Sequence, residues 1–334
     1  MIHGIDVHTH FVPSEFPAYL GKGSNVPWPS MKHVGCGHAH VMIQGKNYRS
    51  VTEACWHGEK RISDMDGMRI RRQVVSPMPE LLSYWLPPED AAVLLRHIND
   101  EIAGLCNAHP DRFSGLGGVP LQDVDLAIRE LEHILKSQKL LGVELATHVN
   151  GVSIGDPRFD PFFAAAEELG ATIFVHALRP AGKDRLVGPA NLEQVVAFPG
   201  DVALGIASLI TGGVIERHPK LRIGFSHGGG GFAMVLPRLE HGWNVFPAVK
   251  DTLPHPPSTY ARKLFYDTLV YDPIALRYIV ERFGLSQIMI GTDYPFGICE
   301  TDPHGAVAAA SLGADAEKML REDNARRYLG MPSA

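Results

Sequence analysis

The chain has 334 residues, of which 45% are hydrophobic and 20% charged, and its formal net charge is −6 at pH 7. The apolar content excludes a disordered chain, and the acidic balance excludes a basic surface for nucleic acid. No run approaches the roughly 18 uninterrupted apolar residues of a membrane span, and residues 1–6 show no signal-peptide pattern. The four cysteines lack metal-ligand spacing, so we expect a reducing cytoplasmic location. They are Cys36, Cys55, Cys106 and Cys299.

Short apolar runs rich in β-branched residues alternate with helical patterns along the whole chain. We interpret the runs as eight buried parallel strands: Gly4–His8, Gln73–Ser76, Gly115–Pro120, Gly142–Ala146, Ala171–His176, Leu221–His227, Leu264–Thr268 and Gln287–Thr292. The predicted helices are Pro88–Ala108, Val124–Lys139, Pro157–Leu169, Val202–Arg217, Gly231–Val245, Pro273–Phe283 and Ala314–Leu329. This α/β alternation predicts a single domain over residues 1–334, either a closed (β/α)8 TIM barrel or a long doubly wound sheet.

One interval interrupts the alternation. Residues 11–62, after the first strand, are rich in Gly, Pro, His and Ser and include Trp28 and Trp56. A structureless loop of this length is improbable in a compact domain, and the aromatic content argues against disorder. We therefore expect an insertion that folds over the active-site end of the barrel, rather than a disordered surface loop.

Histidine and aspartate stand at the ends of four predicted strands. His8 and His10 are two residues apart on the first strand, so their side chains point the same way. His176 and His227 end the fifth and sixth strands, and Asp293 directly follows the eighth. Because the C-terminal ends of barrel strands open onto one face, we expect all five side chains to converge there.

Such a set can bind a metal ion and use it. Three His and one carboxylate can hold one Zn²⁺-like ion with a position left for water, whose pKa the ion would lower towards about 7. A further His can exchange protons near neutral pH. The end of the fourth strand offers Glu144, Thr147 and His148 but no Lys. A carbamylated bridge between two metals therefore has no obvious source, and a mononuclear site is favoured.

These residues resemble the amidohydrolase superfamily and, more narrowly, its branch of aminocarboxymuconate-semialdehyde decarboxylases. The resemblance runs almost from end to end and implies a TIM barrel and a zinc-dependent decarboxylase. The segments that carry it are Ile5–Phe11, Gly45–Arg49, Val119–Asp123, Ser226–Gly230 and Gly291–Phe296.

The resemblance also implies roles for individual residues. His8, His10, His176 and Asp293 would bind zinc, and His227 would be the acid/base beside it, with Asp293 counted among the catalytic residues. Arg49 would bind a substrate carboxylate, and Arg238 would reach the neighbouring active site across a homodimer interface. Lys46 and Phe296, which lie in two of the matching segments, are further candidate substrate contacts.

The chain departs from the family pattern at two places. Phe246 stands where the family often has a third arginine, and Ala177–Pro180 replaces an aromatic and an acidic residue that follow the fifth-strand histidine. Arg179 could supply the lost cationic contact to the substrate, or it could pair with a carboxylate on the barrel rim. These changes affect the identity of the substrate more than the class of reaction.

The resulting hypothesis is zinc-dependent, non-oxidative decarboxylation of a carboxymuconate-semialdehyde-type or related unsaturated or aromatic acid, such as a hydroxybenzoate. A hydrolase or hydratase of a small acidic lactone, amide or unsaturated acid is the first alternative, because the same site serves both chemistries. A barrel that has lost catalysis and only binds a partner is the second. The expected partners are a small carboxylate-bearing metabolite and a second copy of the chain. The apolar segment Gly231–Arg238 fits a dimer-facing helix and equally fits packing on the barrel.

Overall fold

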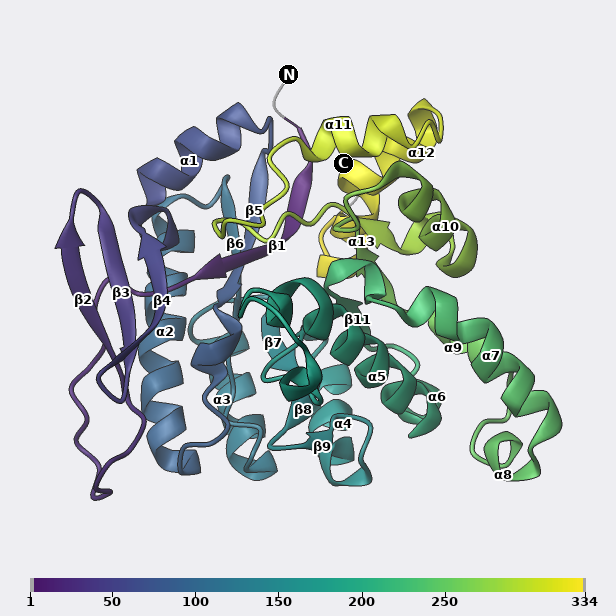
Figure 1. Ribbon diagram of the computed structural model, residues 1–334, viewed down its shortest axis with the longest axis horizontal. Helices are drawn as coiled ribbons and strands as arrows, with labels where there is room; N and C mark the ends of the chain where they lie inside the picture. Colours follow the sequence, from purple (N-terminus) through teal and green to yellow (C-terminus); the bar gives the residue numbers. More distant parts are fainter. Residues whose placement is uncertain (1–2, 333–334) are drawn as a thin grey trace.

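The structure is a computed structural model that describes residues 3–332, so the first and last two residues of the predicted domain lie outside the described residues. Eight parallel strands form its centre (Figure 1). Their order is β1 (Ile5–Phe11), β5 (Arg72–Pro77), β6 (Phe113–Gly117), β7 (Gly142–Ala146), β10 (Thr172–His176), β11 (Arg222–Phe225), β12 (Phe265–Asp267) and β13 (Ile288–Met289). The amide of Val7 donates to the carbonyl of Ile290 at 2.9 Å, and the amide of Asp293 donates to that of His8 at 2.9 Å. These bonds close the sheet, so the fold is the (β/α)8 barrel and not the doubly wound sheet.

The barrel strands are buried on both faces, which explains their nearly continuous apolar sequences. All seven residues of β1 are buried. Apolar side chains such as Val7, Phe174 and Met289 form one buried cluster with Tyr328 of the last helix. The Phe174 ring lies 5.0 Å from the ring of His8, so this apolar layer reaches the polar end of the barrel.

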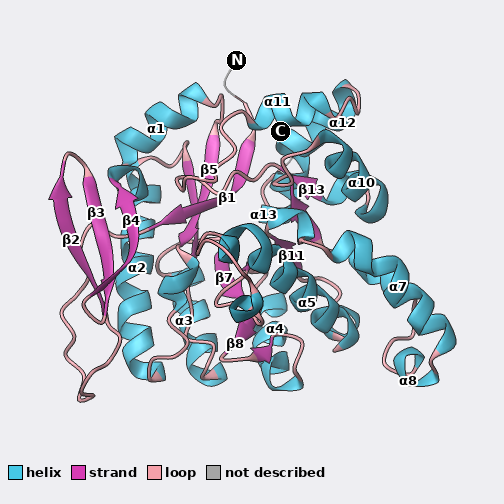
Figure 2. Ribbon diagram, in the orientation of Figure 1, coloured by secondary structure: helices cyan, strands magenta, loops and turns pink. Residues whose placement is uncertain are grey.

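Helices surround the strands (Figure 2). They are α1 (Gly58–Gly67), α2 (Pro88–Ala108), α3 (Val124–Lys136), α4 (Asp160–Glu168), α5 (Phe198–Thr211), α6 (Val214–Arg217), α7 (Phe232–Val245), α8 (Pro247–Lys250), α9 (Pro257–Ala261), α10 (Pro273–Phe283), α11 (Pro303–Ala309), α12 (Ala314–Lys318) and α13 (Asn324–Leu329). Short 3-10 turns are η1 (Glu53–Cys55), η2 (Pro79–Leu82), η3 (Pro157–Phe159), η4 (Lys183–Arg185), η6 (His227–Gly229) and η7 (Leu285–Gln287). Two π-helical turns are η5 (Glu193–Ala197) and η8 (Met319–Asp323).

All eight predicted strands and the seven predicted helices have a counterpart, with shifted ends. The predicted helix 202–217 is divided into α5 and α6 because Gly213 adopts a left-handed φ of +74°. The predicted helix 314–329 contains the π-turn η8 between α12 and α13. Helix α1 was not predicted, because its buried residues are Arg61 and Met65 rather than a regular apolar stripe.

The residues after β1 form a sheet of their own. It is antiparallel, with the order β2 (Pro29–Gly35), β3 (His38–Ile43) and β4 (Lys46–Thr52), and stands beside α2 at the left of Figure 1. Ala39, Val41 and Val51 are buried beneath it. Phe11 still belongs to β1, and residues 58–62 belong to α1. A small hairpin, β8 (His148–Val149) and β9 (Val152–Ser153), follows β7.

One helical segment among residues 3–332, Glu193–Thr211, is long and apolar enough to cross a membrane by length and composition alone. It comprises η5 and α5 and lies between two barrel strands in the chain. Val202, Ile206 and Ile210 are buried in the core of the protein, as in the barrel-facing side of an ordinary helix.

Candidate metal centre

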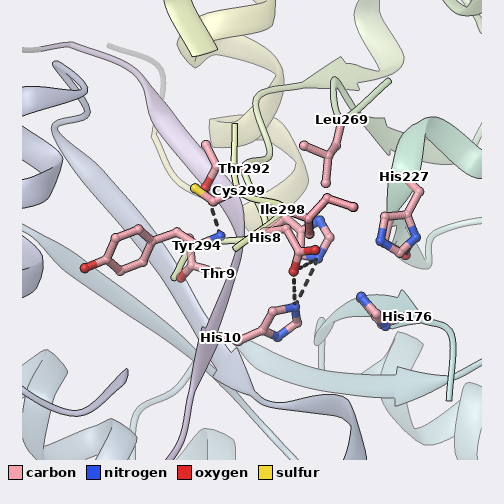
Figure 3. A network of polar contacts seen from close by, with 12 residues as sticks. His8, Thr9, His10, His176, His227, Leu269, Thr292, Tyr294, Ile298 and Cys299 are labelled. Atoms are coloured by element: carbon pink, nitrogen blue, oxygen red, sulfur yellow. Dashed lines mark hydrogen bonds and ion pairs between the residues drawn. The ribbon is translucent and has the colours of Figure 1, made fainter. Parts of the chain in front are cut away.

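Four predicted ligands converge at the C-terminal end of the barrel. Both histidines of β1 meet His176 at the end of β10 and Asp293 after β13, and one ligand atom from each lies within 4.8 Å of all the others. His10 Nε2 is 3.1 Å from His8 Nε2 and 3.1 Å from Asp293 Oδ1. All four residues are buried. Figure 3 shows the three imidazoles directed toward one point, with His227 beside them.

The histidine tautomers fit a bound cation. His8 Nδ1 lies 2.7 Å from Asp267 Oδ2, His10 Nδ1 lies 3.3 Å from the carbonyl of Pro77, and His176 Nδ1 lies 2.7 Å from the carbonyl of Ala177. With an ion bound, each Nδ1 would carry the donated hydrogen, and each Nε2 would present a lone pair to the centre. His176 Nε2 is buried without a hydrogen-bond partner among the described residues. A set of three imidazole nitrogens and one carboxylate oxygen suits Zn²⁺ or a similar divalent ion.

The charges of the site also favour a cation. Burial alone would raise the pKa of Asp293, but the hydrogen bond from His10 and the charge of His8 outweigh it and hold that pKa well below its usual range. Burial lowers the pKa of His10 and, together with neighbouring histidines, of His176. His8 is the exception: against the effect of burial, Asp267 and Asp293 raise its pKa to about 9. A metal ion would displace the Nε2 proton of this imidazolium and leave the Nδ1 hydrogen donated to Asp267.

His227 lies beside this cluster. Its ring is 4.8 Å from that of His176 and 5.4 Å from that of His8. Its Nδ1 lies 3.2 Å from Ser226 Oγ, which leaves Nε2 for a proton-transfer partner. Burial and the charge of His8 lower its pKa to about 4, so the imidazole is neutral at pH 7 and can accept a proton.

One residue of this centre escaped the sequence analysis. Asp267 ends β12 and is fully buried between His8 and the backbone of His227. The predicted seventh strand extends to Thr268 and so places Asp267 inside the strand, whereas β12 ends at Asp267. The rule that revealed the histidines, a polar residue at the end of a barrel strand, could have found it.

A pocket of about 470 Å³ opens above the four ligands and includes Arg49, Phe296 and His227 in its wall. The Phe296 ring stacks on His10 with centroids 5.3 Å apart. The Arg49 guanidinium, supplied by β4, lies 4.3 Å over the same Phe296 ring. No carboxylate of the described residues forms an ion pair with Arg49, in contrast to the other arginine of the pocket.

That other arginine, Arg179, is paired. Its Nη2 lies 2.6 Å from Oε1 of the buried Glu80, and its guanidinium lies 3.2 Å over the ring of Trp85. Both Arg179 and Glu80 line the pocket and also a shallower groove outside it, which contains Lys46. His148 lies nearby, outside the pocket, with Nε2 3.3 Å from the carbonyl of Arg179.

Two residues of interest lie away from the pocket in a single chain. Arg238 is exposed on α7, and Phe246, directly after α7, is 62% exposed. Neither lines the pocket described above.

The fourth strand supplies a buried carboxyl group in place of a lysine. Glu144 accepts a hydrogen bond from Ser76 Oγ, and burial raises its pKa to about 8. Among residues 3–332, only one group of three or more His, Cys, Asp or Glu side chains is arranged to hold a metal ion. The described residues therefore offer one metal position.

Comparisons with known proteins agree with this geometry. The family model described as Amidohydrolase matches residues 5–331. A 2-amino-3-carboxymuconate-6-semialdehyde decarboxylase of Dictyostelium discoideum is 36% identical over 98% of this chain and 91% of its own. A gamma-resorcylate decarboxylase of Rhodococcus jostii is 26% identical over 80% of this chain and 86% of its own. The crystal structure of 5-carboxyvanillate decarboxylase from Sphingomonas paucimobilis superposes with a TM-score of 0.75 at 26% identity, over 82% of this chain and 83% of that one.

Proposed function

We propose a function from one premise: the chain belongs to the amidohydrolase family. The proposed function is zinc-dependent, non-oxidative decarboxylation of a small unsaturated acid of the carboxymuconate-semialdehyde type. The observation that carries it is the convergence of three histidines and one aspartate beside a neutral fourth histidine. The 36% identity to a decarboxylase over nearly the whole chain supports the same reaction class.

The ligand residues and the base have separate tasks in this proposal. His8, His10, His176 and Asp293 would hold the ion, which when bound supplies Lewis acidity and activates water. His227 accepts a proton at Nε2 and returns it to the carbon chain of the substrate. The negative charge of Asp293 stabilises His227 while the imidazole is protonated, because the two side chains interact electrostatically.

The pocket wall fits a flat acid. Arg49 has no carboxylate partner among residues 3–332, so its guanidinium is available to bind a carboxylate of the substrate. Phe296 lines the pocket beside Arg49 and His10, and such an aromatic wall suits a conjugated chain or ring. Lys46 lies in the outer groove, where it would attract an acidic substrate before it enters.

Arg179 acts on the substrate indirectly in this proposal. Its charge is already balanced by Glu80 and its face is covered by Trp85. We therefore assign it to the second of the two roles that its sequence position allows. It neutralises a carboxylate on the pocket wall, and this removes a negative charge that would repel an acid.

A homodimer completes the site. Large apolar side chains are exposed on and next to α7, among them Met234 at 71% and Phe246 at 62%. Leu204 on α5 is 62% exposed as well. An apolar surface of this kind is typical of a subunit interface. Arg238 lies on the same helix, and a second copy seated on α7 would receive its guanidinium as a further carboxylate contact.

The test is product analysis with metal control. Protein stripped by a chelator should lose activity and regain it with Zn²⁺, and CO₂ should be released from a carboxymuconate semialdehyde. His227→Asn should keep its zinc content while turnover falls roughly 10²–10⁴-fold. Full activity of metal-free protein would refute metal dependence. Addition of water without CO₂ release would instead identify a hydratase or hydrolase on the same site.

Decarboxylation of an aromatic acid is the second candidate. It is favoured by the gamma-resorcylate decarboxylase and by the 5-carboxyvanillate decarboxylase, which act on ring acids by their names. A panel that contains hydroxybenzoates beside carboxymuconate semialdehydes separates the two, since the true substrate should have the higher kcat/KM.

A further inference from the structure

We propose that Asp267 is a positioning residue that couples metal binding to the placement of His227. The inference rests on the proposed function for the role of His227 but not for the metal site itself. Asp267 does not line the pocket and is not itself one of the four proposed metal ligands. It acts through the two residues that it holds.

The Asp267 carboxylate accepts four hydrogen bonds, and it is fully buried. Oδ2 accepts from His8 Nδ1 at 2.7 Å and from the amide of His227 at 3.0 Å. Oδ1 accepts from the amide of Gly228 at 2.7 Å and from the amide of Leu269 at 3.0 Å. Both oxygens are therefore saturated, and a single side chain joins a metal ligand to the backbone of the proposed base.

The bond to His8 determines the tautomer of that ligand. With an acceptor at Nδ1, His8 carries its hydrogen there and leaves the Nε2 lone pair for the ion. An amide in place of the carboxylate can turn its NH₂ group toward Nδ1, which would move the hydrogen to Nε2. The ligand would then present a hydrogen to the ion instead of a lone pair.

The hydrogen bonds from the amides of His227 and Gly228 stabilise the turn after β11, whose backbone conformation is unfavourable. His227 and Gly228 have φ angles of +56° and +59°, and the first of these is unusual for a residue with a side chain. The amide hydrogens of both residues point to the same side and donate to the Asp267 carboxylate, as in the concavities that successive backbone N–H groups form for anions. Asp267 occupies that concavity, so its negative charge maintains the turn that points His227 at the metal.

A glycine allows this close arrangement. A Cβ on Gly291 would lie 2.6 Å from Cβ of Asp267 and 2.9 Å from Cβ of His8. Only glycine at this position lets the segment after β13 pass so near to the pair. The contact is therefore built into the barrel and does not depend on a mobile loop.

The test is Asp267→Asn, which preserves the shape of the side chain. Zinc affinity, measured by competition with a chelator, should fall about 10–100-fold. At saturating zinc, kcat should remain lower than in the wild type by a further factor of about 10 or more, because His227 is misplaced. KM should change little, since the Arg49 side of the pocket is untouched.

Asp201→Asn is the matched control. Asp201 is also buried, and its partners, the Thr147 hydroxyl and the amide of Ala181, are not metal ligands. It should lower the thermal midpoint without changing zinc affinity. Asp267→Ser serves as a second variant with a smaller side chain.

Three results would overturn the inference. Zinc affinity within about threefold of the wild type would remove the link to His8. A normal kcat at saturating zinc would remove the link to His227. If neither Asp267 variant folds, Asp267 is required for the stability of the whole protein and not for positioning His8 and His227. Because zinc affinity is measured without turnover, a different reaction would refute the proposed function and leave this result intact.

Discussion

Arg179 and Glu80 form an ion pair across the pocket wall, with Nη2 2.6 Å from Oε1. The pair joins the loop after β10 to the turn η2 after β5, and Trp85 covers the guanidinium. The two partners differ in exposure, since the Glu80 side chain is 5% exposed and the Arg179 side chain 42%. Removal of Arg179 leaves the negative charge of Glu80 at the pocket wall. Removal of Glu80 leaves the positive charge of Arg179 there.

The two single variants should differ in their effect on KM, with a rise only in the variant that lacks Arg179. Arg179→Met leaves a buried, unpaired carboxylate at the pocket, so KM for an acidic substrate should rise about 10-fold or more. Glu80→Gln leaves a free guanidinium, so KM should stay equal or fall. Steady-state kinetics of both variants and of the double variant measure the coupling. A rise of KM in both single variants by the same factor would mean that Arg179 contacts the substrate directly.

The position of Arg49 in the pocket wall gives a direct prediction about substrate binding. Arg49→Met should raise KM about 10–100-fold, because a charged hydrogen bond to a carboxylate is lost, and Arg49→Lys should restore only part of it. Lys46→Met is the matched control, since Lys46 lies in the outer groove, and its effect should be small and disappear at high salt. Equal effects at both positions would argue that the carboxylate binds outside the pocket.

The fold and the convergence of the four candidate ligands could be predicted because they follow from local rules. A buried strand produces an apolar run, and a ligand at a strand end interrupts that run with His8, His176 or Asp293. A contact between two side chains from distant segments of the chain produces no such local pattern. The sequence around Glu80 and Arg179 contains no pattern that predicts their ion pair, because the fold brings together two residues that are 99 positions apart. Asp267 does end a barrel strand, so the strand-end rule could have marked it, but its partner His8 on another strand could not be predicted.

A buried arginine illustrates the same limit and gives a stability prediction. Arg61 of α1 is fully buried and donates to the carbonyls of His10 and Ala54, to Thr9 Oγ1 and to Gln73 Oε1. Arg61→Met should reduce the free energy of unfolding by about 3 kcal/mol or more, because four acceptors lose their donor.

Urea denaturation measures this effect. Arg61→Lys should fall between the wild type and Arg61→Met, since it keeps the charge but cannot serve four acceptors. The control is Arg158→Met, whose side chain is 58% exposed and pairs with the nearby Asp156, and it should change stability by less than about 0.5 kcal/mol. A similarly small effect at Arg61 would contradict the importance of its hydrogen bonds.

His304 predicts acid sensitivity of the fold. Burial and the neighbouring His3 lower its pKa from 6.5 to about 4. Between these two pH values the unfolded chain binds more protons at this residue than the folded one. The free energy of unfolding should therefore fall as pH is lowered from about 6.5 to 4, by up to a few kcal/mol.

His304→Gln tests this pH dependence, because glutamine can still donate to the carbonyls of His3 and Arg69 that His304 Nε2 contacts. Its free energy of unfolding should depend less on pH between 4 and 6.5 than that of the wild type. The matched control, His255→Gln, changes an exposed histidine and should keep the wild-type slope. An unchanged slope in His304→Gln would assign the acid sensitivity to other groups.

Complementation between subunits tests the proposed contribution of Arg238. If Arg238 serves the neighbouring site, Arg238→Ala and His227→Asn homodimers should each be nearly inactive. A mixed dimer contains one site with an intact His227 that receives an intact Arg238 from its partner. Random mixing at equal amounts should restore about a quarter of the wild-type activity, since half of the dimers carry one working site. Co-refolding followed by an activity assay measures this recovery.

Mixing Arg238→Ala with His8→Ala should give the same recovery, whereas His227→Asn mixed with His8→Ala should give none. No recovery in the mixtures that contain Arg238→Ala would place the effect of Arg238 within its own subunit.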